Sequence, residues 1–71
     1  MQHKKRTGWH RADVIAELRK KGLSLSGLGR LNSLSPYTLK NALDKPYPRG
    51  EKIIAEALGE SPATIWPERY L

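Results

Sequence analysis

Apolar residues recur every three or four positions along most of this chain, which is the spacing of one face of an α-helix. No segment alternates apolar and polar residues with the period of two that a half-buried strand requires. Helices are expected over residues 10–21, 25–31, 36–43 and 49–58, with one further helical turn over 63–66. The pattern therefore predicts an all-α fold of four main helices and a short C-terminal helical turn.

The ends of these segments carry residues that start and stop helices. Serines suited to N-caps precede three of them, at Ser24, Ser35 and Ser61. Proline follows two of these serines at the first helical position, as Pro36 and Pro62. Glycine is placed to end two helices, at Gly22 and Gly59. The two prolines of segment 44–48 predict a stiff loop without helix.

The core must consist mainly of aliphatic side chains, because the chain has no phenylalanine. The two tryptophans, Trp9 and Trp66, are expected to be its bulky members. The side chains expected to point inward are Ala12, Val14, Ile15, Leu18, Leu25, Leu28, Leu31, Leu39, Ala42, Leu43, Ile53, Ile54, Ala57 and Leu58. Glu51 and Glu56 are expected to lie on the surface of the fourth helix. A core of this size rarely supplies more than about 3–5 kcal/mol.

The second and third helices, with the short polar turn between them, predict a helix-turn-helix. Gly29 stands where the second helix must approach the third, so that alanine is expected to be tolerated there and leucine to overpack. Asn32 and Ser33 are expected to end the second helix, since asparagine tolerates the left-handed conformation. Leu34 is an apolar plug in the turn. An ordinary helical hairpin has the same periodicity and remains the alternative.

The outward face of the third helix carries residues suited to reading base pairs. Tyr37, Lys40, Asn41 and Asp44 follow one another at helical spacing, and Thr38 borders them. Asparagine pairs bidentately with adenine, lysine contacts guanine or phosphate, and tyrosine or threonine contacts a thymine methyl group or a phosphate. This stripe predicts a recognition helix for the major groove; a merely solvated face is the alternative.

Charge is distributed unevenly along the chain. Residues 1–40 contain nine Lys or Arg against two acids, whereas residues 41–71 contain four against five. A one-sided basic field attracts polyanions, of which double-stranded DNA is the leading candidate. Residues 1–8 are expected to be a flexible basic arm, and residues 9–71 a single DNA-binding domain. Further DNA contacts are expected from Lys4, Lys5, Arg6, Arg11, Ser24, Ser26, Arg30, Ser35 and Pro36.

Several classes of protein are disfavoured by composition. The chain has no cysteine, and His3 and His10 are too few for a metal site. Neither histidine is placed as a base for a serine nucleophile, so we expect no enzyme, no cofactor and no metal. No apolar run approaches the roughly 20 residues of a membrane span, and the basic N-terminus lacks the apolar stretch of a signal peptide. A cytoplasmic protein is expected.

The sequence resembles the Ner family of small DNA-binding regulators from Mu-like phages and their bacterial Ner-like (Nlp) relatives. The resemblance is carried by WHRADVIAELRKKGLSLSGLGR at 9–30, TLKNAL at 38–43, and GEKIIAEALG with IWPERY within 50–70. It implies a lambda-repressor-like helical domain that binds operator DNA, with residues 36–43 as recognition helix. Asn32 and Ser33 stand where such turns usually carry glycine.

The chain is therefore expected to be a sequence-specific, double-stranded DNA-binding regulator of transcription that acts as a repressor. We expect a monomer in solution that pairs as a two-fold dimer on DNA, because one recognition helix contacts few base pairs. Two alternatives stay open. One is a basic helical adaptor that binds a protein partner or a membrane surface, and the other is a protein that coats DNA without specificity.

Overall fold

The structure is a computed structural model that describes residues 8–70. Within that range the chain forms the helices α1 (Arg11–Lys20), α2 (Leu25–Leu31), α3 (Thr38–Asp44), α4 (Pro48–Leu58) and α5 (Pro62–Ile65), followed by a 3-10 helix, η1 (Pro67–Arg69). Residues 8–70 contain no strand, which confirms the all-α prediction. None of the described helices is long and apolar enough to cross a membrane. Apart from Gly8, the predicted basic arm lies outside the described residues.

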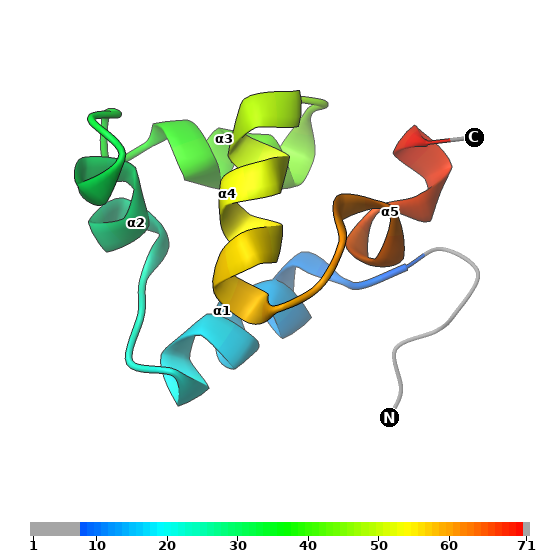
Figure 1. Cartoon of the computed structure of the whole chain (residues 1–71), viewed down its shortest axis with the longest axis horizontal. Helices are drawn as coiled ribbons and strands as arrows, with labels where there is room; N and C mark the ends of the chain where they lie inside the picture. The colour runs from blue at the N-terminus through cyan, green and yellow to red at the C-terminus, as the bar shows by residue number, and fades with distance from the viewer. Residues whose placement is uncertain (1–7, 71) are drawn as a thin grey trace.

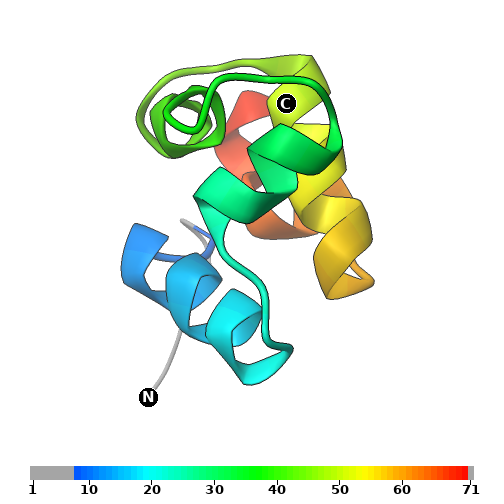
Figure 2. The ribbon, with the colours of Figure 1, turned by 90° about the vertical axis from the view of Figure 1, so that its left-hand side faces the viewer.

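Helix α4 runs through the middle of the molecule and contacts α1, α2, α3 and α5 (Figure 1). Seen from the side, α2 lies in front, with α1 below it and α3 above (Figure 2). The core joins α1, α3, α4 and α5 through the fully buried residues Val14, Leu18, Leu39, Ala42, Ile54, Ala55 and Ile65, and α2 adds the buried Leu28. Both tryptophans belong to this assembly as predicted, since Trp66 is buried and Trp9 packs against the cluster.

Most helix ends follow the expected capping residues. The Ser24 hydroxyl accepts a hydrogen bond from the Gly27 amide at 3.0 Å, and Ser61 accepts one from Thr64. Gly22 and Gly59 both adopt positive φ at helix ends. Helix α1 begins one residue later than predicted, because His10 is its N-cap.

The starts of α3 and α4 differ from the prediction. Ser35 and Pro36 were expected at the N-cap and first position of the third helix, but they form a turn before it. The Ser35 hydroxyl accepts the Tyr37 amide at 3.2 Å, which stabilises this turn. Proline was expected to exclude helix through residue 48, yet Pro48 begins α4. This is its favourable first position, where no amide hydrogen is needed. Similarly, Pro67 starts η1, with only Trp66 between it and α5.

Two residues expected to point inward are exposed. Leu31 is 77 % exposed, and Ala12 also faces solvent. An α-helix turns by about 100° per residue, so a spacing of three drifts by about 60° at each step. Leu31 consequently lies about 120° around α2 from Leu25. The prediction for Leu31 was wrong because it extended a three-residue spacing over two steps.

Gly29 lies where α2 meets the turn before α3. A Cβ atom built there would lie 2.9 Å from the carbonyl oxygen of Ser35, which belongs to the backbone. The expectation that alanine is tolerated is therefore corrected. We expect Gly29→Ala to lower the free energy of unfolding by about 1–2 kcal/mol, since the clash outweighs the gain in helix propensity. Urea unfolding measures it; a more stable Gly29→Ala variant would contradict the close approach.

Ser33 occupies the position at which glycine is usual. It adopts a φ of 61°, whereas Asn32 keeps a φ of −106° and donates its side-chain amide to the Leu28 carbonyl. The left-handed conformation costs an L-residue about 1–2 kcal/mol. We expect Ser33→Gly to raise the melting temperature, with a gain of about 1 kcal/mol. Ser33→Ala is the matched control, because alanine keeps the strain and should bring no such gain.

Candidate nucleic-acid interface

Helices α2 and α3 form the predicted helix-turn-helix. The Leu34 amide donates to the Gly29 carbonyl at 2.7 Å, and the Leu34 side chain packs against the core. Leu28 and Leu39 are buried between the helices, as expected. Leu34 therefore acts as the apolar plug, and the turn fixes the angle at which α3 projects.

The exposed face of α3 begins in the turn before it and continues along the helix. Tyr37, Lys40 and Asn41 are exposed, and Thr38 is half-buried. Tyr37 is 70 % exposed, which is unusual for an aromatic side chain. Neither the Lys40 ammonium nor the Asn41 amide hydrogen-bonds to a described residue. These side chains have no structural role in this part of the chain, and their polar groups are available to a ligand.

Asp44, the last member of the stripe, pairs with Arg11 from α1. The Arg11 guanidinium lies 2.6 Å from the Asp44 carboxylate, and both side chains are about half exposed. The sequence predicted each as a separate DNA contact, whereas the structure brings the two together. An exposed ion pair contributes only about 0–1 kcal/mol to stability. Its effect is electrostatic, because Arg11 cancels the one negative charge on this face of α3.

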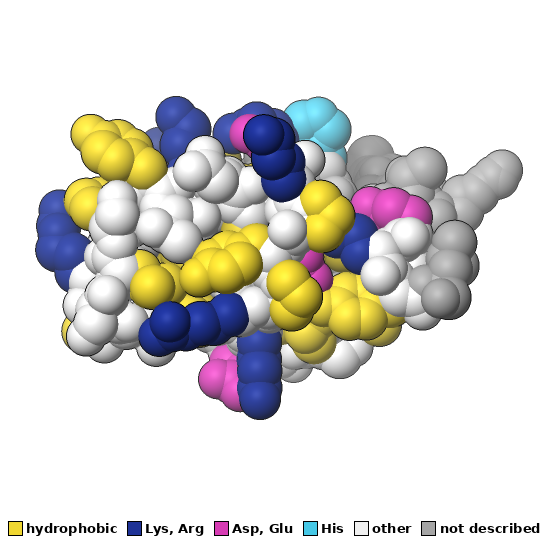
Figure 3. Space-filling model, turned by 90° about the horizontal axis from the view of Figure 1, so that it is seen from above, with side chains coloured by type: hydrophobic (Ala, Val, Ile, Leu, Met, Phe, Trp, Pro, Cys, Tyr) yellow, Lys and Arg dark blue, Asp and Glu magenta, His cyan; other side chains and the backbone are white. Residues whose placement is uncertain are grey.

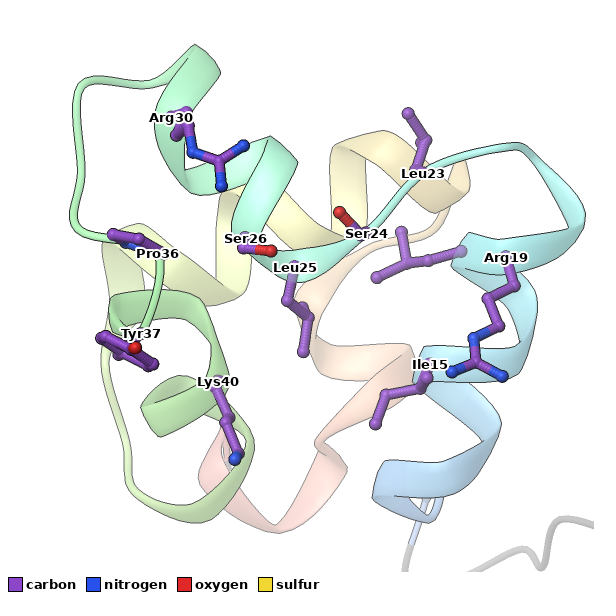
Figure 4. A pocket seen from close by; sticks show the side chains of 11 residues that line it. Ile15, Arg19, Leu23, Ser24, Leu25, Ser26, Arg30, Pro36, Tyr37 and Lys40 are labelled. Carbon is purple, nitrogen blue, oxygen red and sulfur yellow. The ribbon is translucent and has the colours of Figure 1, made fainter.

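A groove of about 450 Å³ opens between α1, α2 and α3 (Figure 4). Ile15 and Leu25 contribute apolar side chains to it, and Ser26 lies near its centre. Three cations from three different helices surround it, namely Arg19, Arg30 and Lys40. Arg30, Ser26 and Lys40 were named from the sequence.

Arg19 was not predicted as a binding residue. It follows Ile15 by four positions, so it shares the helix face that Ile15 presents to the groove. Helical spacing alone was the available signal. Seen from above, basic and hydrophobic side chains are interspersed over this face of the molecule (Figure 3).

A network of hydrogen bonds around a buried carboxylate supports the C-terminal end of α3. The Arg69 guanidinium donates to the carbonyl oxygens of Ala42 at 2.8 Å and Leu43 at 3.2 Å. It also lies 3.1 Å from the carboxylate of Glu51, which is only 2 % exposed. The same carboxylate accepts the Tyr70 hydroxyl at 2.5 Å. The prediction that Glu51 is a surface acid was wrong, and neither Arg69 nor Tyr70 was recognised.

These contacts decide the protonation state of Glu51. Burial raises the pKa of its carboxyl, but hydrogen bonds from Tyr70, from the Tyr47 amide and from Arg69 outweigh burial and bring the pKa below its ordinary value of 4.5. The hydrogen bond to Glu51 in turn raises the pKa of Tyr70 above its ordinary value of 10.0. Glu51 is therefore ionised at neutral pH and is stabilised by its three donors.

The histidines and acidic residues that the structure describes do not gather into a metal site. No cluster of three His, Cys, Asp or Glu residues that could hold a metal ion occurs among residues 8–70. His10 accepts the Ala12 amide as a helix cap, and His3 lies outside the described residues. What the surface offers is an exposed helix with amide and ammonium donors, next to a basic groove.

Known proteins resemble this chain over most of its length. A family model described as winged helix-turn-helix DNA-binding matches residues 8–71. A negative regulator of transcription from Escherichia phage D108 is 66 % identical over 65 residues, covering 92 % of this chain and 89 % of the relative. Sugar fermentation stimulation protein B of Escherichia coli K12 is 60 % identical over 62 residues, covering 87 % of this chain and 67 % of the relative.

The fold is matched by a solved structure as well. The solution structure of the Mu Ner protein has a TM-score of 0.78 and 54 % sequence identity, covering 97 % of this chain and 93 % of the other. Residues 8–70 contain no strand from which a wing could be built, so the shared element is the helix-turn-helix. Members of such a family are not enzymes, in agreement with the sequence. The chain belongs to the Ner family of helix-turn-helix DNA-binding regulators of transcription.

Proposed function

We propose that this protein represses transcription by binding a preferred sequence of duplex DNA, with α3 in the major groove. The observation that carries the proposal is the exposed face of α3, where Lys40 and Asn41 keep their polar groups unpaired among the described residues. Asparagine and lysine are among the side chains that distinguish base pairs. The phage D108 and phage Mu relatives are named negative regulators of transcription, which supports repression rather than activation.

The base-reading residues are proposed to be Tyr37, Thr38, Lys40 and Asn41. The residues around them are proposed to contact the DNA backbone, namely Ser24, Ser26, Arg30, Ser35 and Pro36. Arg11 of α1 lies beside the C-terminal end of α3. Its ion pair with Asp44 prevents the Asp44 carboxylate from repelling phosphate. Lys4, Lys5 and Arg6 remain candidates for phosphate contacts from the arm. The adaptor alternative is not favoured, because the chain's relatives are DNA-binding regulators.

Two copies are proposed to bind each operator, because the seven residues of α3 span little more than a few base pairs. Half-sites related by two-fold symmetry should then lie about 34 Å apart, or a multiple of that distance. Sedimentation of the free protein should show a monomer, and titration of the operator should show two copies bound. One copy on an asymmetric footprint would contradict this arrangement.

Selection of bound duplexes from a random pool tests the proposed function. We expect one preferred sequence, bound at least about 10³-fold more tightly than a scrambled duplex of the same composition at the same salt concentration. Equal binding of all duplexes would instead identify a protein that coats DNA without specificity. Binding to anionic vesicles but not to DNA would favour the adaptor alternative.

A further inference from the structure

We infer that the groove between α1, α2 and α3 binds one sugar-phosphate strand of the DNA, and that Arg19 of α1 contacts a phosphate of that strand. This inference rests on the proposed function. It adds α1 to the helix-turn-helix as a binding element, through a residue that the sequence analysis did not name.

The chemistry of the groove matches that of a nucleic acid strand. A DNA strand alternates anionic phosphates with apolar deoxyribose rings. The groove combines apolar side chains, such as Ile15 and Leu25, with three surrounding cations. No acidic residue occurs among the described residues that line it. The Ser26 hydroxyl makes no hydrogen bond to a described residue, so it is available to donate to a phosphate oxygen.

The position of the groove on the protein fits a DNA strand that borders the major groove of the duplex. Lys40 belongs to α3 and also lines the groove, opposite Arg19 (Figure 4). If α3 lies in the major groove of the DNA, the DNA strand at the edge of the major groove runs past Lys40 and across the N-terminal end of α2. Arg19 then stands on the far side of the strand, where it can contact a phosphate that α3 does not reach.

Arg19 and its neighbour Lys20 are a matched pair for mutation, because both are cations of α1 and only Arg19 lines the groove. The Lys20 ammonium pairs with Glu17 at 3.1 Å, and Lys20 does not line the groove. Arg19 makes no ion pair with a described residue and lines the groove. Both are exposed cations in the last turn of α1, so replacing either one changes the net charge equally, and Lys20→Ala additionally loses only an exposed ion pair, which contributes little to stability.

The experiment compares Arg19→Ala with Lys20→Ala on the preferred and the scrambled duplex across a range of salt concentrations. Loss of one phosphate contact should reduce the log–log salt slope by about 0.9, which amounts to about eightfold in affinity between 1 M and 0.1 M salt. We expect this change for Arg19→Ala on both duplexes, with the preference ratio unchanged. Lys20→Ala should show little change.

A second measurement locates the contact. Phosphates of the preferred duplex are replaced one at a time by neutral methylphosphonates. We expect a position at which the parent and Lys20→Ala lose affinity while Arg19→Ala loses none further, because its contact is already gone. Equal behaviour of Arg19→Ala and Lys20→Ala in both measurements would overturn the inference.

Failure of this inference can be distinguished from failure of the proposed function. If the parent protein prefers no duplex, the proposed function fails. If the parent prefers one duplex and a variant of the α3 face loses that preference, the role of α3 as the recognition helix is supported. The salt dependence and the methylphosphonate profile of Arg19→Ala then decide whether Arg19 contacts a phosphate.

Discussion

Replacing Glu51 with alanine is expected to unfold most of the protein at room temperature. The carboxylate is buried and receives hydrogen bonds from Arg69, Tyr70 and the amide of Tyr47. Removing one partner of a buried ion pair costs about 3–5 kcal/mol, because the other charge is left without compensation. A domain of this size rarely has more than about 3–5 kcal/mol in total. Circular dichroism during urea unfolding measures the loss.

The control is Glu56→Ala on the same helix. Glu56 is exposed, so its replacement should change stability by no more than about 0.5 kcal/mol. The double variant Glu51→Leu with Arg69→Met should recover part of the loss, since it removes both charges and keeps apolar volume. If Glu51→Ala unfolded at the same urea concentration as Glu56→Ala, the network would have no stabilising role.

Acid unfolding provides a second measure of the same network. The pKa of Glu51 is lower in the folded protein than in the unfolded chain, so the unfolded chain binds the proton first as the pH falls. Its contribution is therefore complete above about pH 4.5 and is lost as the pH decreases through the folded-state pKa. The Glu51→Gln variant, if it folds, should show a smaller loss of stability over this range than the parent.

Replacing Asn41 with alanine is expected to impair recognition while leaving the fold intact. The side chain is exposed and makes no hydrogen bond to a described residue, so the melting temperature should barely change. Loss of a bidentate base contact should weaken binding to the preferred duplex by about 1–3 kcal/mol, or roughly 5- to 150-fold. Discrimination should be relaxed at one base-pair position, which a panel of singly substituted duplexes would identify.

Lys40→Ala separates the two contacts that Lys40 could make. Loss of a phosphate contact should weaken the preferred and the scrambled duplex equally, whereas loss of a guanine contact should weaken mainly the preferred one. If both Asn41→Ala and Lys40→Ala bound the preferred duplex as tightly as the parent, α3 would not be the recognition helix.

Local sequence signals predicted the local parts of this structure well. Ser24, Ser61, Gly22 and Gly59 act within a few residues of their own position, and the helices end where these residues predict. Helical spacing likewise placed Lys40 and Asn41 on the exposed face of α3. Each of these features depends on neighbours within about one helical turn.

Features that depend on distant partners could not be predicted in this way. Glu51 has the helical position of a surface acid, and only the folded chain shows that Arg69 and Tyr70 cover it. Asp44 was predicted as a DNA contact from its place on the helix face, and nothing in that spacing indicated its ion pair with Arg11, 33 positions away. Arg19 acquires its importance from a groove that three helices create together. Pairing between charges far apart in sequence leaves no periodic signal.

The contacts of Arg69 have a consequence for the synthesis of the protein. The carbonyl oxygens of Ala42 and Leu43 receive their donors from a residue 26 or 27 positions further along the chain. A nascent chain on the ribosome can therefore form the helix-turn-helix hydrogen bonds early, but the end of α3 stays incomplete until Arg69 has emerged. Proteolytic removal of residues from Arg69 onwards would also take Arg69 and Tyr70 away from the buried Glu51 carboxylate, so a clipped molecule should unfold rather than keep a folded α3.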